Sequence, residues 1–532
     1  MDSNTPEYSN EQVDGAIDAD QTAPRRAVTP TVLEAMKRAR NGGSRDEVPA
    51  RTLHKHPVLT SDRQNSETTG EEASDAASLS ENEPSEIELP TLPTAAASQP
   101  PTPPGAMFSL SRWKALIGIL FLAILVFNAL NSGNAQFLGA QGWGIVLGGS
   151  NNTNNQNILN TINKELQHHV TPSPGLTATA TQQITPAQYI NLIIKNMTLD
   201  QKLGQMMIVQ FLGPAYSLDI SAMISQYDVG AVLLFTANNN IQTKTQLKGL
   251  ISQMQRNSAI PLAVAIDQEG GYVDRLVNLD GARPSASSIG ATNDASKAQA
   301  EGVQDASDLA SYGFNLNLAP VVDVNTVYNP QLYGRTFGNT PAIVTRMAEA
   351  YLQGLQQSGK VFGTLKHFPG LGDVATDPHS GVPDVYRSKS QLEAIDWAPY
   401  RAMIQQGNVH AIMVTHEVLY AIDGSMPSSL SYKVVTGILR DELGFQGVII
   451  TDSLTMEGIT AFYSEAQAAA LAIEAGDDLI MGASTPQDVA SMIEGIKQAV
   501  TTGAISTQRI DDSVRRILTM KFQMGLLSIP TN

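Results

Sequence analysis

Eight short apolar runs, each followed by a stretch with the spacing of an amphipathic helix, constrain the fold of this chain most strongly. The runs are Met206–Phe211, Ala231–Phe235, Leu262–Ile266, Leu316–Val322, Val361–Leu365, Ala411–Val414, Val448–Ile450 and Leu479–Met481. Alternation of buried strands with helices is typical of parallel α/β folds. Eight such units predict a single (β/α)8 TIM-type barrel over residues 185–532.

A doubly wound dinucleotide-binding sheet is the competing α/β architecture. Its main sequence support would be a Gly-x-Gly-x-x-Gly turn that opens a helix after the first strand. This sequence has no such turn and no phosphate-binding P-loop. The barrel is therefore the favoured architecture, and no cofactor is expected.

Ionisable and amide side chains stand at the ends of five consecutive apolar runs. These residues are Asp267, Asp323, Asn325, Lys366, His367, His416 and Asp452. In a parallel barrel, all of these positions fall on the carboxyl-terminal rim, where active sites are built. The pattern predicts an active site on that rim.

The densest group of polar residues follows the fifth run. It consists of Lys366-His-Phe-Pro-Gly-Leu-Gly-Asp373 and, shortly after, Asp377-Pro378-His379. A buried core does not concentrate ionisable groups in this way. A site for a hydroxyl-rich or charged ligand does, because several donors and acceptors must converge on one point.

These motifs resemble the β-N-acetylhexosaminidase branch of glycoside hydrolase family 3. The resemblance extends over most of residues 190–525. Its motifs are Met197-Thr-Leu-Asp-Gln-Lys-Leu-Gly-Gln-Met206, Ile266-Asp-Gln-Glu-Gly-Gly271 with Arg275, Ala319-Pro-Val-Val-Asp-Val-Asn325, Gly334-Arg-Thr-Phe-Gly338, Lys366-His-Phe-Pro-Gly370, Asp377-x-His379 and Ile450-Thr-Asp-Ser-Leu454. Their order and spacing together indicate the family more strongly than any one of them.

The resemblance implies three catalytic residues. Asp452 would be the nucleophile, because a carboxylate captures an oxocarbenium-like transition state as a covalent ester. His379, oriented by Asp377, would be the acid/base, since an imidazole both gives and takes a proton near neutral pH. The alternative for Asp452 is an aspartate that caps the next helix. The alternative for Asp377 and His379 is an ordinary surface turn. Pro378 departs from the family, which usually has a small residue there, so the loop geometry is in question.

The resemblance also implies a set of contacts with the sugar hydroxyls. The residues concerned are Asp267, Arg275, Arg335, Lys366 and His367. The alternative is an internal salt-bridge network below the pocket. Leu371 stands where this branch commonly has histidine and is given no catalytic role, and His416 is expected to be a pocket-wall or structural residue. A metal site is not expected, because the His367, His379 and aspartate positions fit no standard ligand spacing.

The region before the barrel has a different composition. Residues 1–111 are rich in Glu, Ser, Thr, Pro and Ala, which predicts a disordered tail. The run Ala115–Leu130 is apolar and uncharged, and we interpret residues 112–131 as a single transmembrane signal anchor in the lipid bilayer. Residues 132–184, rich in Gly, Asn, Gln and Thr, are expected to be a flexible low-complexity linker.

The charges beside the anchor predict its orientation. Arg112 and Lys114 precede it, and the next basic residue is Lys164. The positive-inside rule then places the tail in the cytoplasm and the catalytic domain outside the cell membrane. A net charge of −17 argues against nucleic-acid binding, and the absence of cysteine excludes disulfides and thiolate chemistry.

Together these features predict a retaining exo-β-N-acetylglucosaminidase, with a monomeric catalytic domain that acts on amino-sugar oligosaccharides from peptidoglycan or chitin. Many β-glucosidases of the family that this chain resembles carry a second domain that supplies the acid/base. Because this chain stops at Asn532, soon after the last helical stretch, we expect the Asp377–His379 loop to supply it instead. The alternatives are a β-glucosidase or β-xylosidase of the same family and a non-catalytic cell-wall-binding protein. Phosphorolysis, with phosphate in place of water, also stays open. A histidine acid/base lacks the negative charge that would repel phosphate.

Overall fold

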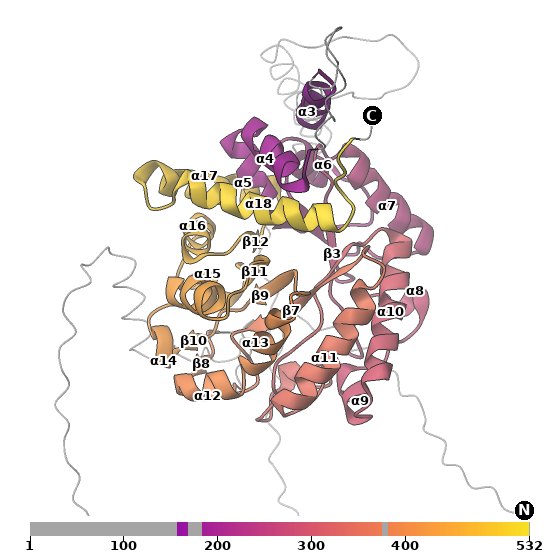
Figure 1. Cartoon of the computed structure of the whole chain (residues 1–532), viewed down its shortest axis with the longest axis vertical. Coiled ribbons are helices and arrows are strands. Elements are labelled where there is room, and N and C mark those ends of the chain that lie inside the picture. The colour runs from indigo at the N-terminus through magenta and orange to yellow at the C-terminus, as the bar shows by residue number, and fades with distance from the viewer. Residues whose placement is uncertain (1–156, 169–183, 375–380, 531–532) are drawn as a thin grey trace, which may run out of the picture. The chain divides into compact units, whose positions relative to one another are not determined.

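The fold is a closed parallel barrel, seen in a computed structural model that describes residues 157–168, 184–374 and 381–530 (Figure 1). Eight strands follow one another around the barrel in chain order, and the last pairs with the first. They are β1 (Met207–Val209), β2 (Ala231–Leu233), β3 (Ala263–Ile266), β6 (Leu316–Asn317), β7 (Phe362–Phe368), β9 (Ala411–Val414), β11 (Val448–Ser453) and β12 (Leu479–Met481). Each of the eight apolar runs overlaps one barrel strand, with β7 and β11 extending beyond their runs, so the barrel prediction is confirmed.

One main helix follows each barrel strand. In chain order these helices are α6 (Leu218–Ser225), α7 (Lys244–Asn257), α10 (Ala295–Tyr312), α11 (Pro341–Gln356), α13 (Ala398–Gln405), the π-helix η3 (Lys433–Glu442), α16 (Glu465–Ala475) and α17 (Pro486–Thr502). The strands are buried on both faces, because one face lies inside the barrel and these helices cover the other. This double burial explains why the strands are continuous apolar runs and do not alternate between apolar and polar residues.

Further helices flank this ring. Helices α4 (Pro186–Asn196) and α5 (Leu199–Gln205) precede β1, and α18 (Thr507–Gln523) follows α17. Lys521 of α18 is fully buried and donates to Gln205 Oε1 at 2.8 Å, which joins α18 to the residue at the end of α5. In Figure 1 these helices lie together beside α17.

The loops after the barrel strands carry smaller elements. After β3 come the hairpin strands β4 (Gln268–Gly270) and β5 (Val273–Asp274) with helices α8 (Val277–Asp280) and α9 (Ala286–Ala291). The remaining ones are the 3-10 helices η1 (Pro330–Leu332) and η2 (Ser428–Leu430), the paired strands β8 (Asp384–Val385) and β10 (Val418–Leu419), and helices α12 (Lys389–Ala394), α14 (Tyr420–Asp423) and α15 (Glu457–Thr460). Because these loops leave the carboxyl ends of the strands, they surround the predicted active site.

Reciprocal caps begin several helices. In α4, α5, α12 and α16, a Ser or Thr accepts from the backbone three residues on, and a Gln returns a bond to the cap backbone. Such a cap satisfies two backbone groups that would otherwise have no partner at a helix start. The helix boundaries are therefore encoded locally.

A helix occupies part of the segment predicted to be a flexible linker. Helix α3 (Asn157–His168) lies within residues 132–184, and its Ile158 and Ile162 belong to the buried apolar cluster. The spacing of these isoleucines places both on one face of a helix, which gives that face an apolar surface to bury. An unbroken linker is therefore the wrong prediction for residues 157–168.

Several other predictions concern residues outside the described ranges. The tail (1–111), the anchor (112–131) and the acid/base pair Asp377 and His379 all lie there. Among the helices of the described ranges, none is both long enough and apolar enough to cross a membrane.

Candidate active site

A cavity of about 640 Å³ opens at the carboxyl ends of the barrel strands. Every strand contributes to it through a residue in or just after the strand. These residues, in chain order, are Gln210, Leu233, Asp267, Leu318, Lys366, Met413, Asp452 and Met481. The cavity is therefore centred on the barrel axis, at the rim where the sequence predicts the active site.

The six predicted site residues that the structure describes all line this cavity. They are Asp267, Arg275, Arg335, Lys366, His367 and Asp452. Their carboxylates, guanidinium groups, ammonium group and imidazole converge on one space although they are far apart in the sequence. A convergent polar set of this kind is what a small hydroxyl-rich ligand requires.

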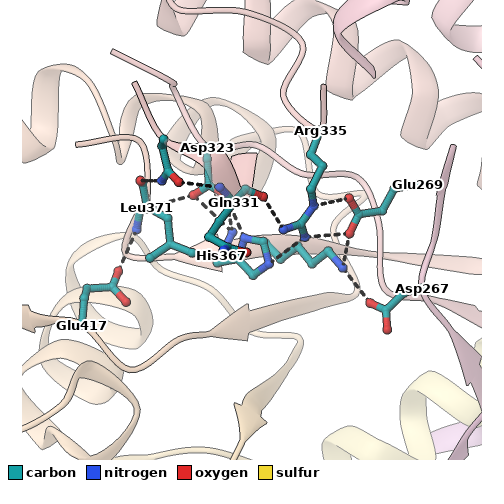
Figure 2. A network of polar contacts seen from close by, with 11 residues as sticks. Asp267, Glu269, Asp323, Gln331, Arg335, His367, Leu371 and Glu417 are labelled. Carbon is teal, nitrogen blue, oxygen red and sulfur yellow. Dashed lines mark hydrogen bonds and ion pairs between the residues drawn. The ribbon is translucent and has the colours of Figure 1, made fainter. Parts of the chain in front are cut away.

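Four charged side chains form a buried network on one side of the cavity (Figure 2). Lys366 Nζ lies 2.7 Å from Asp267 Oδ1 and 2.6 Å from Glu269 Oε1. Arg335 holds Glu269 with two parallel bonds, from Nε to Oε2 at 2.8 Å and from Nη2 to Oε1 at 2.9 Å. Two cations and two carboxylates thus balance one another, and the fork-shaped pairing fixes the guanidinium plane.

Glu269 is at the centre of this network, although sequence reasoning gave it no role. Its burial favours the neutral acid, but the charges of Lys366 and Arg335 outweigh burial and hold the pKa of Glu269 well below its usual range. Burial favours a neutral amine in Lys366, yet Asp267 and Glu269 raise its pKa. Glu269, Lys366 and Arg335 are therefore ionised together, and Asp267 and Lys366 line the cavity. The signal available in the sequence was the position of Glu269, two residues after Asp267.

His367 is held in a defined orientation by Asp323 and Arg335. Its Nδ1 lies 2.8 Å from Asp323 Oδ2, and Arg335 Nη2 lies 3.4 Å from its Nε2. Because a guanidinium only donates, Nε2 accepts and Nδ1 carries the proton that is donated to Asp323. The side chain of Asp323 is fully buried, so this residue orients His367 and does not meet the ligand itself.

Asp323 also fixes the backbone that follows β7. Its Oδ1 accepts from the amide of Leu371 at 2.8 Å, and Asn329 Nδ2 donates to the carbonyl of Leu371 at 2.9 Å. Glu417 Oε1 accepts from the amide of Gly370 at 3.2 Å, and burial raises the pKa of Glu417 well above its usual range. The side chain of Leu371 forms part of the apolar wall of the cavity. The backbone at Gly370 and Leu371, shortly before the undescribed segment 375–380, is therefore held beside the cavity.

Asp452 lies near the end of β11 and faces the cavity. Its Oδ1 accepts from the amide of Ser453 at 2.7 Å. The carbonyl of Ser453 in turn lies 2.9 Å from His416 Nε2, while His416 Nδ1 lies 2.7 Å from Ser429 Oγ. His416 is fully buried and supports the backbone next to Asp452, in agreement with the structural role expected for it.

Arg275 offers the cavity a donor that the described residues leave unused. Its Nε is buried and has no hydrogen-bond partner within the described ranges, and its guanidinium carbon lies 5.4 Å from the ring centre of Phe235. Both residues line the cavity. A buried donor without a partner is costly, so this guanidinium is a weak point in the hydrogen bonding of the cavity wall.

Behind the cavity, a chain of hydrogen bonds supports the segment that carries Asp267 and Glu269. Asn317 Oδ1 accepts from the amide of Gln268 at 2.9 Å, and Asn317 Nδ2 donates to the carbonyl of Gln268 at 2.8 Å. Asn317 Nδ2 also donates to Tyr351 Oη at 3.2 Å, and Tyr351 Oη donates to Asp305 Oδ2 at 2.6 Å. Helices α10 and α11 are thereby connected to the cavity wall.

Asp305 is expected to make the stability of the fold depend on pH. Burial raises its pKa from an ordinary 3.8 to about 8, so the folded state keeps a proton that the unfolded chain releases. The free energy of unfolding should therefore fall as pH rises from about 4 to about 8, by up to about 1.4 kcal/mol per pH unit. Asp305→Asn cannot titrate and should lose this part of the slope, which urea denaturation at several pH values measures. Asp219→Asn, at an exposed position, is the control and should keep the parent's dependence of unfolding free energy on pH. The same dependence in Asp305→Asn would contradict the raised pKa of Asp305.

In the described part of the chain, no group of three or more His, Asp or Glu side chains is placed to hold a metal ion. Two predicted catalytic residues, Asp377 and His379, lie outside that part, and their placement stays a prediction.

Known proteins with similar sequences and folds cover the same region. Over 340 residues, the chain is 31% identical to beta-hexosaminidase A of Pseudoalteromonas piscicida, with 58% of this chain and 55% of that protein covered. It is 33% identical to beta-hexosaminidase LpqI of Mycobacterium tuberculosis, with 60% and 82% covered. The chain thus spans about half the length of the first of these relatives and most of the second.

A solved structure agrees with these sequence matches. A glycoside hydrolase family 3 beta-N-acetylglucosaminidase from Paenibacillus superposes with a TM-score of 0.60 at 35% identity, over 63% of this chain and 65% of that one. The sequence profile of the glycosyl hydrolase family 3 N-terminal domain matches residues 198–520, which is more than half of the chain. The chain belongs to glycosyl hydrolase family 3.

Proposed function

We propose that the protein is a retaining exo-β-N-acetylglucosaminidase, which removes terminal β-linked N-acetylhexosamine from peptidoglycan or chitin-type oligosaccharides. The observation that carries this proposal is the convergence of Asp452 with the Asp267–Lys366–Glu269–Arg335 network on one cavity. The names of the relatives, beta-hexosaminidase and beta-N-acetylglucosaminidase, support the amino-sugar substrate.

In the first step, a carboxylate oxygen of Asp452 forms a bond to the anomeric carbon of the terminal sugar. The glycosidic carbon–oxygen bond breaks at the same centre, and the leaving oxygen takes a proton from His379. Asp267, Lys366 and Arg275 hold the sugar by its hydroxyl and amide groups, since charged groups form the strongest hydrogen bonds. The product is a glycosyl ester on Asp452 and a released alcohol.

In the second step, water attacks the same carbon from the opposite side. His379 takes a proton from the water, the ester bond breaks, and Asp452 is released as a carboxylate. Two inversions give net retention. The change of Asp452 from anion to neutral ester removes a negative charge near the imidazole, which makes the imidazole easier to deprotonate. Asp377 would orient the ring.

Kinetics of the full-length protein on aryl β-glycosides test the proposal. Activity on the N-acetylglucosaminide above the glucoside and the xyloside, with retention in the first product, is expected. A preference for the glucoside or xyloside would indicate the other activities of the family. No turnover of any glycoside would favour a cell-wall-binding protein. A sugar phosphate formed only in phosphate buffer would indicate phosphorolysis.

Replacing His379 by alanine should produce losses that depend on the leaving group. Aryl leaving groups need little protonation, so glycosylation of the enzyme by aryl substrates should suffer far less than that by natural sugars. The pH profile of kcat/KM should also lose the limb that belongs to the imidazole. Asp377→Ala should give a smaller loss in the same direction. Equal losses on aryl and natural substrates would assign the acid/base to another residue.

We further propose that residues 112–131 anchor the protein in the cell membrane with the catalytic domain outside. The uncharged apolar run and the preceding Arg112 and Lys114 support this topology. A protease added to intact cells should release an active soluble fragment, cut between Asn131 and Gln183. Protection of the catalytic domain until the membrane is broken would contradict the orientation.

A further inference from the structure

Two largely exposed tyrosines form a ring pair on loops that line the cavity. The exposed fractions are 73% for Tyr272 and 62% for Tyr333, and their ring centres lie 5.5 Å apart at an angle of 55°. Large aromatic side chains normally bury most of their surface, and paired aromatic rings are most often found in cores or interfaces. A pair of rings that leaves most of its surface in water therefore points to a binding surface.

Tight backbone turns hold the two rings in place. Tyr272 follows Gly270 and Gly271, which have φ angles of +77° and +60° at the end of strand β4. A side chain on Gly270 would meet the carbonyl oxygen of Pro284 at 2.2 Å, so the hairpin packs directly on that backbone. Tyr272 is therefore presented by a rigid turn and not by a loose loop.

The second ring rests on the same support. Gly334, with a φ of +75°, follows Tyr333, and its carbonyl accepts from the amide of Ser287 at 3.2 Å. A side chain on Gly334 would approach the Tyr272 ring at 3.2 Å. Both tyrosines are thus anchored to residues 284–287, which keeps the rings in their relative positions before any ligand arrives.

The two loops that carry the rings contribute to the wall of the cavity. Glu269 and Val273 flank Tyr272 in the sequence, Gln331 and Arg335 flank Tyr333, and all four flanking residues line the cavity. Arg335 Nη1 donates to the carbonyl of Gln331 at 2.9 Å, which fixes the backbone near Tyr333 to the charged network. Neither tyrosine lines the cavity itself, so both rings lie on the exposed surface of loops that do.

We propose that Tyr272 and Tyr333 form a platform for the pyranose ring on the leaving-group side of the bond that is cleaved. The terminal sugar occupies the cavity, where Asp267 and Lys366 take its hydroxyls, so the next ring of the oligosaccharide emerges at the mouth. The C–H groups on a pyranose face are the positive partner that the negative face of an aromatic ring attracts. This inference rests on the proposed glycosidase function and specifies its preference for oligosaccharides.

Two alcohol leaving groups of different size test the platform. Tyr272→Ala and Tyr333→Ala are compared with the parent in the full-length protein, on the trisaccharide of β-1,4-linked N-acetylglucosamine and on methyl β-N-acetylglucosaminide. Each variant should lose about three- to tenfold in kcat/KM on the trisaccharide, mainly through KM. The methyl glycoside, whose leaving group is too small to reach the rings, should change by less than about twofold.

Conservative and distant variants provide the controls. Tyr272→Phe and Tyr333→Phe keep the ring and should retain the parent value on the trisaccharide. Tyr432, which is 61% exposed and does not line the cavity, should tolerate alanine without loss on either substrate. Equal losses on both substrates, or no loss on either with an active parent, would overturn the platform alone. An inactive parent would overturn the proposed function, and the platform with it.

Discussion

Asp452→Asn is expected to lower kcat by at least about 10³-fold while the fold stays intact. The amide nearly matches the carboxylate in size and can still face the cavity, so the loss measures the missing nucleophile and not a missing side chain. A second variant, Asp452→Ala, makes room for a small anion, and added azide should restore part of its activity by attacking the anomeric carbon in place of the carboxylate.

The control for this experiment is an exposed aspartate of the same domain that does not line the cavity. Asp219 is exposed near the start of α6, and Asp219→Asn should keep the parent kcat. Thermal unfolding should show that Asp452→Asn is folded, because within the described residues its carboxylate makes a local hydrogen bond, with the Ser453 amide, that the asparagine oxygen can keep. Activity of Asp452→Asn within tenfold of the parent would exclude Asp452 as the nucleophile.

Glu269→Ala is expected to have the largest effect on stability, with a loss of about 3–5 kcal/mol in the free energy of unfolding. The side chain of Glu269 is 3% exposed and contacts both Lys366 and Arg335. Its removal leaves Lys366 with Asp267 alone and takes the carboxylate partner away from Arg335. An uncompensated buried charge costs far more than the pair itself contributes. Activity should fall as well, because Lys366 and Arg335 lose the group that positions them. Urea denaturation and kcat/KM are the measurements.

A surface ion pair provides the matched comparison. Glu393 contacts Lys389 at 2.5 Å, but its side chain is 33% exposed and that of Lys389 is 44% exposed. Glu393→Ala should leave the free energy of unfolding nearly unchanged, because water solvates the ammonium of Lys389 that has lost its partner. If Glu269→Ala proved as mild as Glu393→Ala, the network around Glu269 would not be the structural support that its geometry indicates.

The barrel and most of its rim could be predicted from the sequence alone. Strands buried on both faces are continuous apolar runs, and this local signal located all eight. Polar residues such as Asp267, Lys366 and Asp452 interrupt the pattern where the runs end, which placed them on one rim. The residues of α3 carried a weaker signal, because a short amphipathic face in a polar segment depends on a surface to pack against.

Only the tertiary structure decided which residues of the site form hydrogen bonds and ion pairs with one another. Glu269 meets Arg335, Asp323 meets His367, and Glu417 meets Gly370 across separations of 66, 44 and 47 residues. Hydrophobic periodicity carries no information on such pairs, because a charge finds its partner through the fold of the barrel and not through its neighbours in the chain. The sequence by itself thus determined the scaffold and the place of the site, while the supporting network follows from burial, which makes every charge there require a partner.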